Sequence, residues 1–226
     1  MNEKRFYNDE QVAALPFISS SHEHSREWKV RENSSGKLIK YLKKNRSLKI
    51  LEVGCGNGWL CHRLSSIPGS MVIGVDINST ELEQAARIFN HIPNLQFVNG
   101  DIITGLFRDT RFDIILFAAS IQYFQSATKI IKTALGLLNE GGEVHVIDSP
   151  FYDKVDLEAA QTRSKAYFIT AGFPQMVNHY FHHLYDDLKT FKPERLSLFG
   201  KIAWLPRKSN HPFNWYRIRK ETAPCH

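Results

Sequence analysis

Residues 48–60, LKILEVGCGNGWL, constrain the fold of this 226-residue chain more than any other segment. The run is apolar and rich in branched side chains, which is typical of a strand buried on both faces. It ends in three glycines at alternate positions, Gly54, Gly56 and Gly58. Glycines at a strand end allow a sharp turn and a close approach of the backbone to a ligand. Residues 59–66 are expected to begin a helix whose free N–H groups face that ligand, so the pattern predicts a nucleotide-type pocket.

Asp76 closes a second strand expected at residues 71–75 and follows Gly58 by 18 residues. An acidic side chain at the end of this strand can accept hydrogen bonds from the two ribose hydroxyls of a nucleoside. Asp76 can also cap the helix expected near Asn78, and the two roles are compatible. We therefore predict that Asp76 binds ribose.

Strands and helices continue to alternate along the chain. Further strands are expected at residues 95–98, 112–117 and 142–147, and helices at residues 79–89 and 126–138. This alternation indicates an α/β fold in which helices cover both faces of a parallel sheet.

Five motifs between residues 48 and 152 together resemble those of the class I S-adenosylmethionine-dependent methyltransferases: ILEVGCGNG, VIGVDIN, NGDI, FDIILFAASIQYF and LLNEGGEVHVID. An NAD enzyme usually keeps GxGxxG, whose third glycine would fall at Trp59. The resemblance implies a Rossmann-like, seven-stranded, mostly parallel sheet whose last strand is antiparallel. The closing strands are expected near residues 198–205 and 213–219. The implied cofactor is S-adenosyl-L-methionine.

The resemblance also implies roles for the residues of the cofactor site. The glycine turn would contact the methionine part of the cofactor, with Glu52 near its ammonium group and Arg31 near its carboxylate. Ile77 would pack against adenine, Asp101 would lie at the other edge of the ring, and the small Ala118 would leave room for it. The residues expected to bind the cofactor are Glu52, Gly54, Cys55, Gly56, Asn57, Gly58, Asp76, Ile77, Asp101, Ile102, Ala118 and Arg31.

The length and composition fit one domain with a substantial core. Within it, residues 1–47 are expected to form an N-terminal helical cover, residues 48–152 the cofactor-binding core, and residues 153–226 a substrate-side helix and a closing hairpin. Residues 25–44 are predicted to be helical, with a possible break at residues 33–36. Trp28 and Arg31 lie three residues apart and so share one helix face.

Catalysis is harder to locate, because methyl transfer mainly requires alignment, exclusion of water and, for some acceptors, removal of a proton. Tyr123 and two residues of the segment HYFHHLYDD, His182 and His183, are the catalytic candidates. A metal pair of His179 and His183 would require that segment to be helical, and no metal is expected. The residues expected to bind the substrate are Trp28, Gln122, Asp148 and Tyr152.

The net charge of +6 equals the six lysines and arginines found between residues 201 and 220, where no acidic residue occurs. Arg217 and Arg219 alternate on a strand expected at the edge of the sheet, and we interpret them as a solvated face. The basic hairpin nevertheless leaves an RNA or protein methyltransferase open as an alternative. Our prediction is methyl transfer to oxygen or nitrogen of a small molecule. A non-catalytic nucleoside-binding module is the alternative from another class.

Aminopropyl transfer from the decarboxylated cofactor is disfavoured, since no acids beyond Glu52 are evident around the amine. Cys55, Cys61 and Cys225 show neither disulfide nor metal-ligand spacing. No apolar run approaches the roughly 20 residues of a membrane span, and the N-terminus lacks the core of a signal peptide. We expect a reduced, cytoplasmic protein without a membrane partner, and the oligomeric state stays open.

Overall fold

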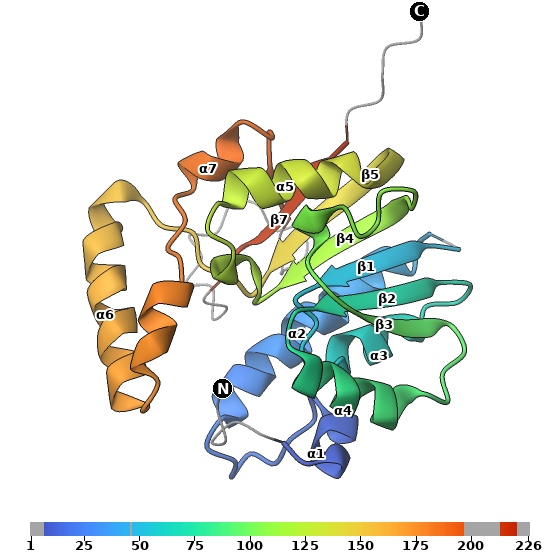
Figure 1. Ribbon diagram of the computed structural model, residues 1–226, viewed down its shortest axis with the longest axis horizontal. Helices are drawn as coiled ribbons and strands as arrows, with labels where there is room; N and C mark the ends of the chain where they lie inside the picture. The colour runs from blue at the N-terminus through green and yellow to red at the C-terminus, as the bar shows by residue number, and fades with distance from the viewer. Residues whose placement is uncertain (1–6, 46, 197–212, 221–226) are drawn as a thin grey trace, which may run out of the picture.

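The computed structural model describes residues 7–45, 47–196 and 213–220. A seven-stranded sheet in the order β3-β2-β1-β4-β5-β7-β6 forms its centre (Figure 1). The parallel strands are β1 (Lys49–Val53), β2 (Met71–Asp76), β3 (Leu95–Asn99), β4 (Phe112–Ala118) and β5 (Leu138–Ile147). β7 (Trp215–Arg219) runs antiparallel to both β5 and β6 (Glu194–Leu196). The predicted fold class is therefore confirmed.

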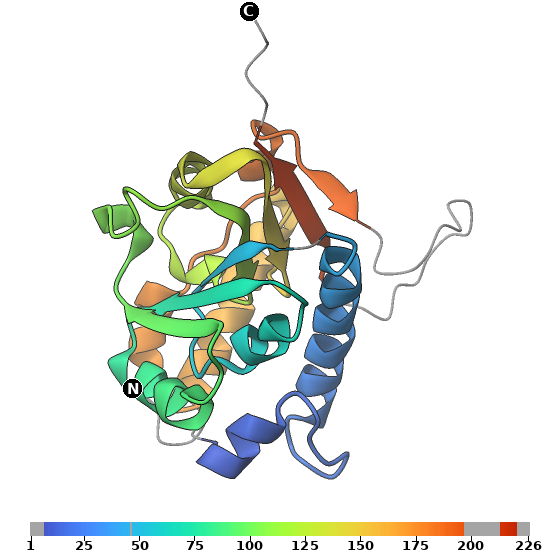
Figure 2. The same ribbon diagram turned by 90° about the vertical axis from the view of Figure 1, so that its right-hand side faces the viewer.

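Helices cover both faces of the sheet, and two separate apolar cores result. On one face lie α2 (Ser25–Leu42), α3 (Trp59–Ser65) and α4 (Ser79–Phe89), and on the other lie α5 (Ala127–Gly136) and α7 (Asp186–Lys189). Figure 2 shows α2 as the long helix standing beside the sheet. The remaining helical elements are α1 (Asp9–Ala14), α6 (Leu157–Thr170), η2 (Ile102–Thr104), η3 (Ile121–Tyr123), η4 (Lys154–Asp156) and η5 (Pro174–His179).

Burial on both faces explains why β1 is apolar at Ile50, Leu51 and Val53. Ile50 belongs to the core under α2 and α3, whereas its neighbour Leu51 belongs to the core under α5, and both are fully buried. Successive side chains of a strand point to opposite faces, so neither face of the strand beyond Lys49 is left to solvent, and Glu52 is buried as well. Burying one such side chain contributes about 1.5–3 kcal/mol. The strand that carries the glycine turn is thus held from both sides.

Helix α2 is continuous, and the break expected at residues 33–36 is wrong. The Ser35 hydroxyl donates to the Arg31 carbonyl at 2.5 Å, and the Ser34 hydroxyl donates to the Asp148 carboxylate at 2.6 Å. Both serines are fully buried. Because the Ser35 hydroxyl bonds a carbonyl one turn back along the helix, it does not cap a new one.

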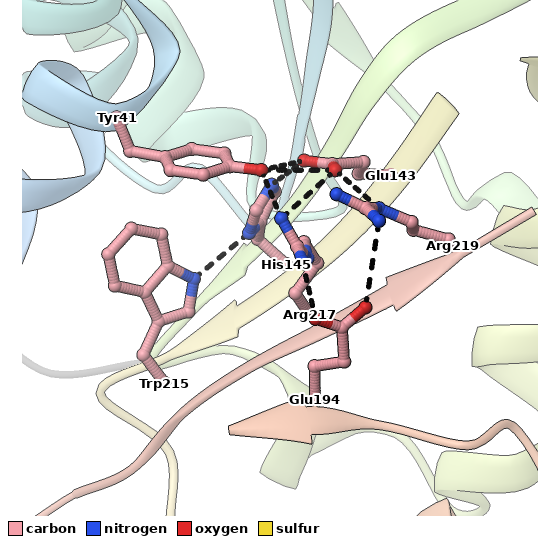
Figure 3. A network of polar contacts seen from close by, with 7 residues as sticks. All are labelled: Tyr41, Glu143, His145, Glu194, Trp215, Arg217 and Arg219. Carbon is pink, nitrogen blue, oxygen red and sulfur yellow. Dashed lines mark hydrogen bonds and ion pairs between the residues drawn. The ribbon is translucent and has the colours of Figure 1, made fainter. Parts of the chain in front are cut away.

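A polar network joins α2 to the closing strands (Figure 3). The Tyr41 hydroxyl donates to Glu143 at 2.8 Å, and His145 Nε2 lies 3.1 Å from the same carboxylate. Trp215 Nε1 donates to His145 Nδ1 at 2.9 Å, so the His145 proton is on Nε2. Burial alone would raise the pKa of Glu143, but hydrogen bonds from His145 and Tyr41 outweigh it and hold that pKa at about 2.

Arg217 belongs to this network, and the interpretation of it as part of a solvated face is wrong. Its side chain is 8% exposed and contacts Tyr41, Glu143 and Glu194. Arg219 also pairs with Glu143, at 3.1 Å. The reason is topological: β7 lies between β5 and β6 and is not an edge strand. The two arginine charges are therefore compensated within the fold.

The expected strand at residues 198–205 lies outside the described residues. β7 begins two residues inside the predicted range 213–219, and β6 lies upstream of the predicted hairpin partner. Within the described part of the chain, no helix has the length and apolar character that a membrane crossing requires.

Candidate functional site

The three glycines after β1 have the backbone conformation that the sequence pattern implied. Their φ angles are +74° at Gly54, +52° at Gly56 and +73° at Gly58, a region that other residues rarely adopt. A Cβ atom on Gly54 would also lie 2.6 Å from Cβ of Ser120, and one on Gly58 would lie 2.5 Å from Cζ of Phe97. Glycine is therefore required here by backbone conformation and by close packing together.

Asp76 fixes this glycine turn to the end of β2. Its Oδ2 atom accepts the Gly56 N–H at 2.8 Å, and its Oδ1 atom accepts the Asn78 N–H at 2.9 Å. Asp76 was also expected to cap a helix, but the N-cap residue of α4 is Asn78, whose N–H Asp76 accepts. A carboxylate has about four acceptor positions, so two remain for a ligand. Ribose binding by Asp76 stays a prediction.

A cavity of about 200 Å³ lies between the glycine turn, the end of β4 and the N-terminal cover. We call it the glycine-loop cavity. Nine of the residues predicted for cofactor, substrate or catalysis line it: Trp28, Arg31, Glu52, Gly54, Cys55, Gly56, Asn57, Ala118 and Tyr123. The cavity is also lined by six residues outside the set predicted for the site: Tyr7, His24, Glu27, Trp59, Glu81 and Ala119.

Glu52 is the most perturbed acid of this cavity. Its side chain is 2% exposed, and the Cys61 thiol donates to its Oε2 atom at 2.9 Å. Burial, together with the negative charge of Asp76, raises the pKa of Glu52 to about 8. Burial and the same Asp76 charge also raise the pKa of Glu81. The cavity therefore favours a ligand that brings positive charge.

Two further acids, Glu27 and Glu81, accompany Glu52 in the cavity wall. The sequence argument that no additional acid lies near Glu52 is therefore wrong. Glu27 stands four residues before Arg31 and pairs with it at 2.7 Å, so one cation sits among the acids. An arginine in the wall suits a ligand that carries a carboxylate.

The N-terminal cover reaches the cavity through a chain of aromatic contacts. Trp28 Nε1 donates to the Tyr7 hydroxyl at 2.7 Å, and the Arg31 guanidinium lies 4.9 Å from the centre of the Trp28 ring. Trp28 also packs edge-on against Trp59 at 5.3 Å. Trp59 occupies the place where GxGxxG would have its third glycine, and a glycine there could not make this contact. The predicted cover thus contacts the glycine turn through edge-to-face ring pairs.

The side chains expected around adenine differ widely in exposure. Ile77 is 76% exposed next to the glycine turn, whereas Ile102 is buried in the core under α5. The Asp101 carboxylate accepts the Ile103 N–H at 2.9 Å and caps η2. Ile102 therefore offers a ligand its backbone and hardly any side-chain surface. None of these three predicted residues lines the glycine-loop cavity.

Asp148 does not line the glycine-loop cavity, and its role in substrate binding stays a prediction. It is buried and holds Ser34 of α2 in place. Gln122 is also buried: its amide donates to the Ala119 carbonyl at 2.6 Å, and its backbone carbonyl accepts the Phe181 N–H at 2.7 Å. Tyr152 pairs by a β-bridge with Leu184. These residues connect elements of the fold.

The three catalytic candidates occupy three different places. Tyr123 lines the glycine-loop cavity, and His182 lines a second cavity beside α6. His183 is buried, and its Nε2 atom lies 3.1 Å from the Ile121 carbonyl, so it anchors its loop to η3. Residues 180–184 are not helical, so His179 and His183 do not share a helix face as a metal pair would need. The catalytic roles of Tyr123, His182 and His183 stay predictions.

The sequence model of a methyltransferase domain matches residues 44–218, most of the chain. The chain belongs to the methyltransferase domain family. It is 29% identical over 145 residues to a malonyl-[acyl-carrier protein] O-methyltransferase of Halalkalibacterium halodurans, covering 59% of this chain and 53% of that protein. It is 27% identical over 131 residues to a sterol 24-C-methyltransferase of Debaryomyces hansenii, covering 57% of this chain and 35% of that protein.

Solved structures of methyltransferases have the same fold as this chain. The magnesium protoporphyrin IX methyltransferase of Synechocystis, solved with S-adenosylhomocysteine bound, aligns with a TM-score of 0.60 over 93% of this chain and 91% of that protein, at 13% identity. At that identity the likeness concerns the fold. The resemblance to class I methyltransferases predicted from the five motifs is confirmed.

Proposed function

We propose that this chain is an S-adenosylmethionine-dependent methyltransferase that methylates oxygen or nitrogen of a small molecule. The observation that carries the proposal is the wall of the glycine-loop cavity, where the acids Glu27, Glu52 and Glu81 surround the single arginine Arg31. The cofactor carries a sulfonium, an ammonium and one carboxylate. Acids in excess, with one arginine among them, match that distribution of charge.

The residues of the cavity wall and the neighbouring Asp76, which holds the glycine turn, have distinct tasks in this proposal. Glu52 would hold the ammonium group, Arg31 the carboxylate, and Asp76 the ribose. Trp28 and Trp59 would exclude water, which strengthens every electrostatic contact inside the cavity. When bound, the cofactor supplies an electrophilic methyl group on sulfur.

An acceptor that bears a proton suits the residues outside this cavity. Burial lowers the pKa of His182, which favours the neutral imidazole, a group that can hydrogen-bond a hydroxyl or amino substituent of the acceptor. Carbon acceptors occur among the relatives, as the name of the sterol 24-C-methyltransferase states. An acceptor with such polar substituents is our reason to favour oxygen or nitrogen for this chain.

Binding of S-adenosylhomocysteine, measured by isothermal titration calorimetry, tests the donor half of the proposal. Asp76→Ala should weaken binding by about 1–3 kcal/mol, because hydrogen bonds to a buried ligand are lost. Asp109→Ala, which removes an exposed acid that does not line the cavity, is the matched control and should leave affinity unchanged. Absence of binding to the folded wild type at millimolar ligand would refute the proposal.

Transfer of labelled methyl from the cofactor tests the acceptor half. We expect label in a low-molecular-weight extract and none in RNA or protein. Label that appears in RNA or protein alone would refute the small-molecule part of the proposal while leaving the donor half intact.

A further inference from the structure

A second cavity, of about 310 Å³, lies between α6 and η5, beyond the end of β5. We call it the α6 cavity. Its wall combines aromatic, polar and oppositely charged side chains: Glu158, Gln161, Thr162, Ser164, Lys165, Phe168, Val177, Tyr180 and His182. The family core does not require this element, because α6 packs mainly on η4 and η5 and stands apart from the sheet (Figure 1).

A continuous series of rings connects the two cavities. Tyr123 lines the glycine-loop cavity, and its ring centre lies 5.9 Å from that of Tyr180. Tyr180 in turn lies 5.4 Å from Phe168 and 5.2 Å from His182, and these three residues line the α6 cavity. Ring pairs at such separations form a rigid wall against which a flat molecule packs well.

A polar pair lies in the same wall. His182 Nε2 and the Ser164 hydroxyl are 2.9 Å apart. A serine hydroxyl has one donor and two acceptor positions, so Ser164 keeps hydrogen-bonding capacity beyond its contact with the imidazole. The pair can therefore bind a hydroxyl or carbonyl substituent of a ligand.

Helix α6 leaves much of its apolar surface uncovered. Ala160 is its one buried residue, while Tyr167 is 51% exposed and Ile169 is 53% exposed. The charges that line the cavity, Glu158 and Lys165, balance each other. The apolar members of the wall, Phe168 and Val177, share it with these balanced charges, which favours an uncharged ligand body over an anion or a cation.

The size of the cavity limits the ligand. An apolar cavity of about 150 Å³ binds benzene in another protein, so 310 Å³ accommodates roughly two fused rings. A ligand of this size along the wall from Phe168 to Tyr180 would direct its far end toward Tyr123.

We propose that the α6 cavity is the acceptor site, and that it binds an uncharged, flat, two-ring molecule with polar substituents at both ends. The pair Ser164 and His182 holds one substituent, and the other passes Tyr123 into the glycine-loop cavity. The name acceptor site rests on the proposed methyltransferase function, whereas the binding itself does not.

The probe for this site is 2,6-dihydroxynaphthalene, titrated without cofactor and followed by its fluorescence. Thr162→Trp fills the cavity and should weaken binding at least roughly tenfold, while Ser164→Ala, which removes one hydrogen bond, should weaken it about fivefold. Arg163→Trp places the same bulky ring on α6 outside the cavity and should leave affinity unchanged. The saturated analogue 2,6-decalindiol should bind at least roughly tenfold more weakly, because it cannot stack.

S-adenosylhomocysteine affinity, measured on the same variants, separates the two proposals and should equal that of the wild type. A probe that does not bind the wild type, or that binds Thr162→Trp equally well, overturns the site. Equal affinity for the saturated analogue overturns the flat ligand class. Loss of S-adenosylhomocysteine binding in the wild type would instead overturn the proposed function.

Discussion

Replacing Glu52 by glutamine should stabilise the ligand-free protein in a strongly pH-dependent way. In the fold the pKa of this buried carboxyl rises from 4.5 to about 8, so at neutral pH the folded protein holds a proton that the unfolded chain has lost. A group whose pKa is raised by folding contributes no penalty below its unfolded pKa and an increasing one as pH rises toward its folded pKa. Glutamine is neutral throughout and keeps a carbonyl oxygen for the Cys61 thiol.

The size of the effect follows from the pKa shift. Each pH unit above 4.5 lowers the free energy of unfolding of the wild type by about 1.4 kcal/mol, until the pH reaches about 8. The advantage of E52Q should therefore grow from about 1 kcal/mol at pH 5.5 to about 3 kcal/mol at pH 7, and level off above pH 8.

Urea unfolding of both proteins at pH 5.5, 7.0 and 8.5 measures this difference. Comparing the two proteins at each pH removes the contribution of every other titrating group. Glu83→Gln, which makes the same change at an exposed position of α4, is the matched control. Parallel stability curves for wild type and E52Q would refute the account of Glu52 as a protonated buried acid.

Three further outcomes are expected. Cofactor binding should release about 0.9 proton at pH 7, because the bound cation lowers the pKa of Glu52. Calorimetry in buffers of different ionisation enthalpy measures this release, which should be absent in E52Q. Glu143→Gln should cost about 2 kcal/mol at pH 7 in urea unfolding, and the difference from wild type should shrink as pH falls from 4.5 toward 2. In thermal unfolding, Gly54→Ala should lower the free energy of unfolding by more than about 2 kcal/mol. Gly56→Ala should lower it by about 1 kcal/mol, because a Cβ atom on residue 56 would meet only the flexible carboxylate of Glu81, at 3.3 Å.

The sheet and the glycine turn could be predicted because their signals are local. The five parallel strands lie in the predicted ranges, although β5 begins earlier than expected. Helix α4 has the predicted bounds. A strand buried on both faces is mostly apolar, and a turn with positive φ favours glycine, so each constraint is visible in neighbouring residues of the sequence.

Contacts between distant segments produce no such pattern in neighbouring residues of the sequence. Ser34 and Asp148 are 114 residues apart, and their hydrogen bond joins α2 to the residue that follows β5, a contact that no local sequence pattern indicates. Arg217 has the alternation typical of an exposed edge, yet β6 covers it. Tyr7 lies in the cavity wall because α1 docks on α4 through Asp9 and Arg87, 2.8 Å apart, which no sequence pattern indicates.

The two cavities differ in the kind of structure that supports them. The glycine-loop cavity sits on β1 and β4, whose side chains are packed from both faces, so its geometry is fixed by the cores. The α6 cavity rests on a helix that buries one residue and packs on its own neighbours. Substitutions there cost little folding energy, since little is buried. Under the proposed assignment the donor side is rigid and the acceptor side is weakly constrained, so substitutions in the α6 cavity can change the acceptor without disturbing the core that holds the cofactor.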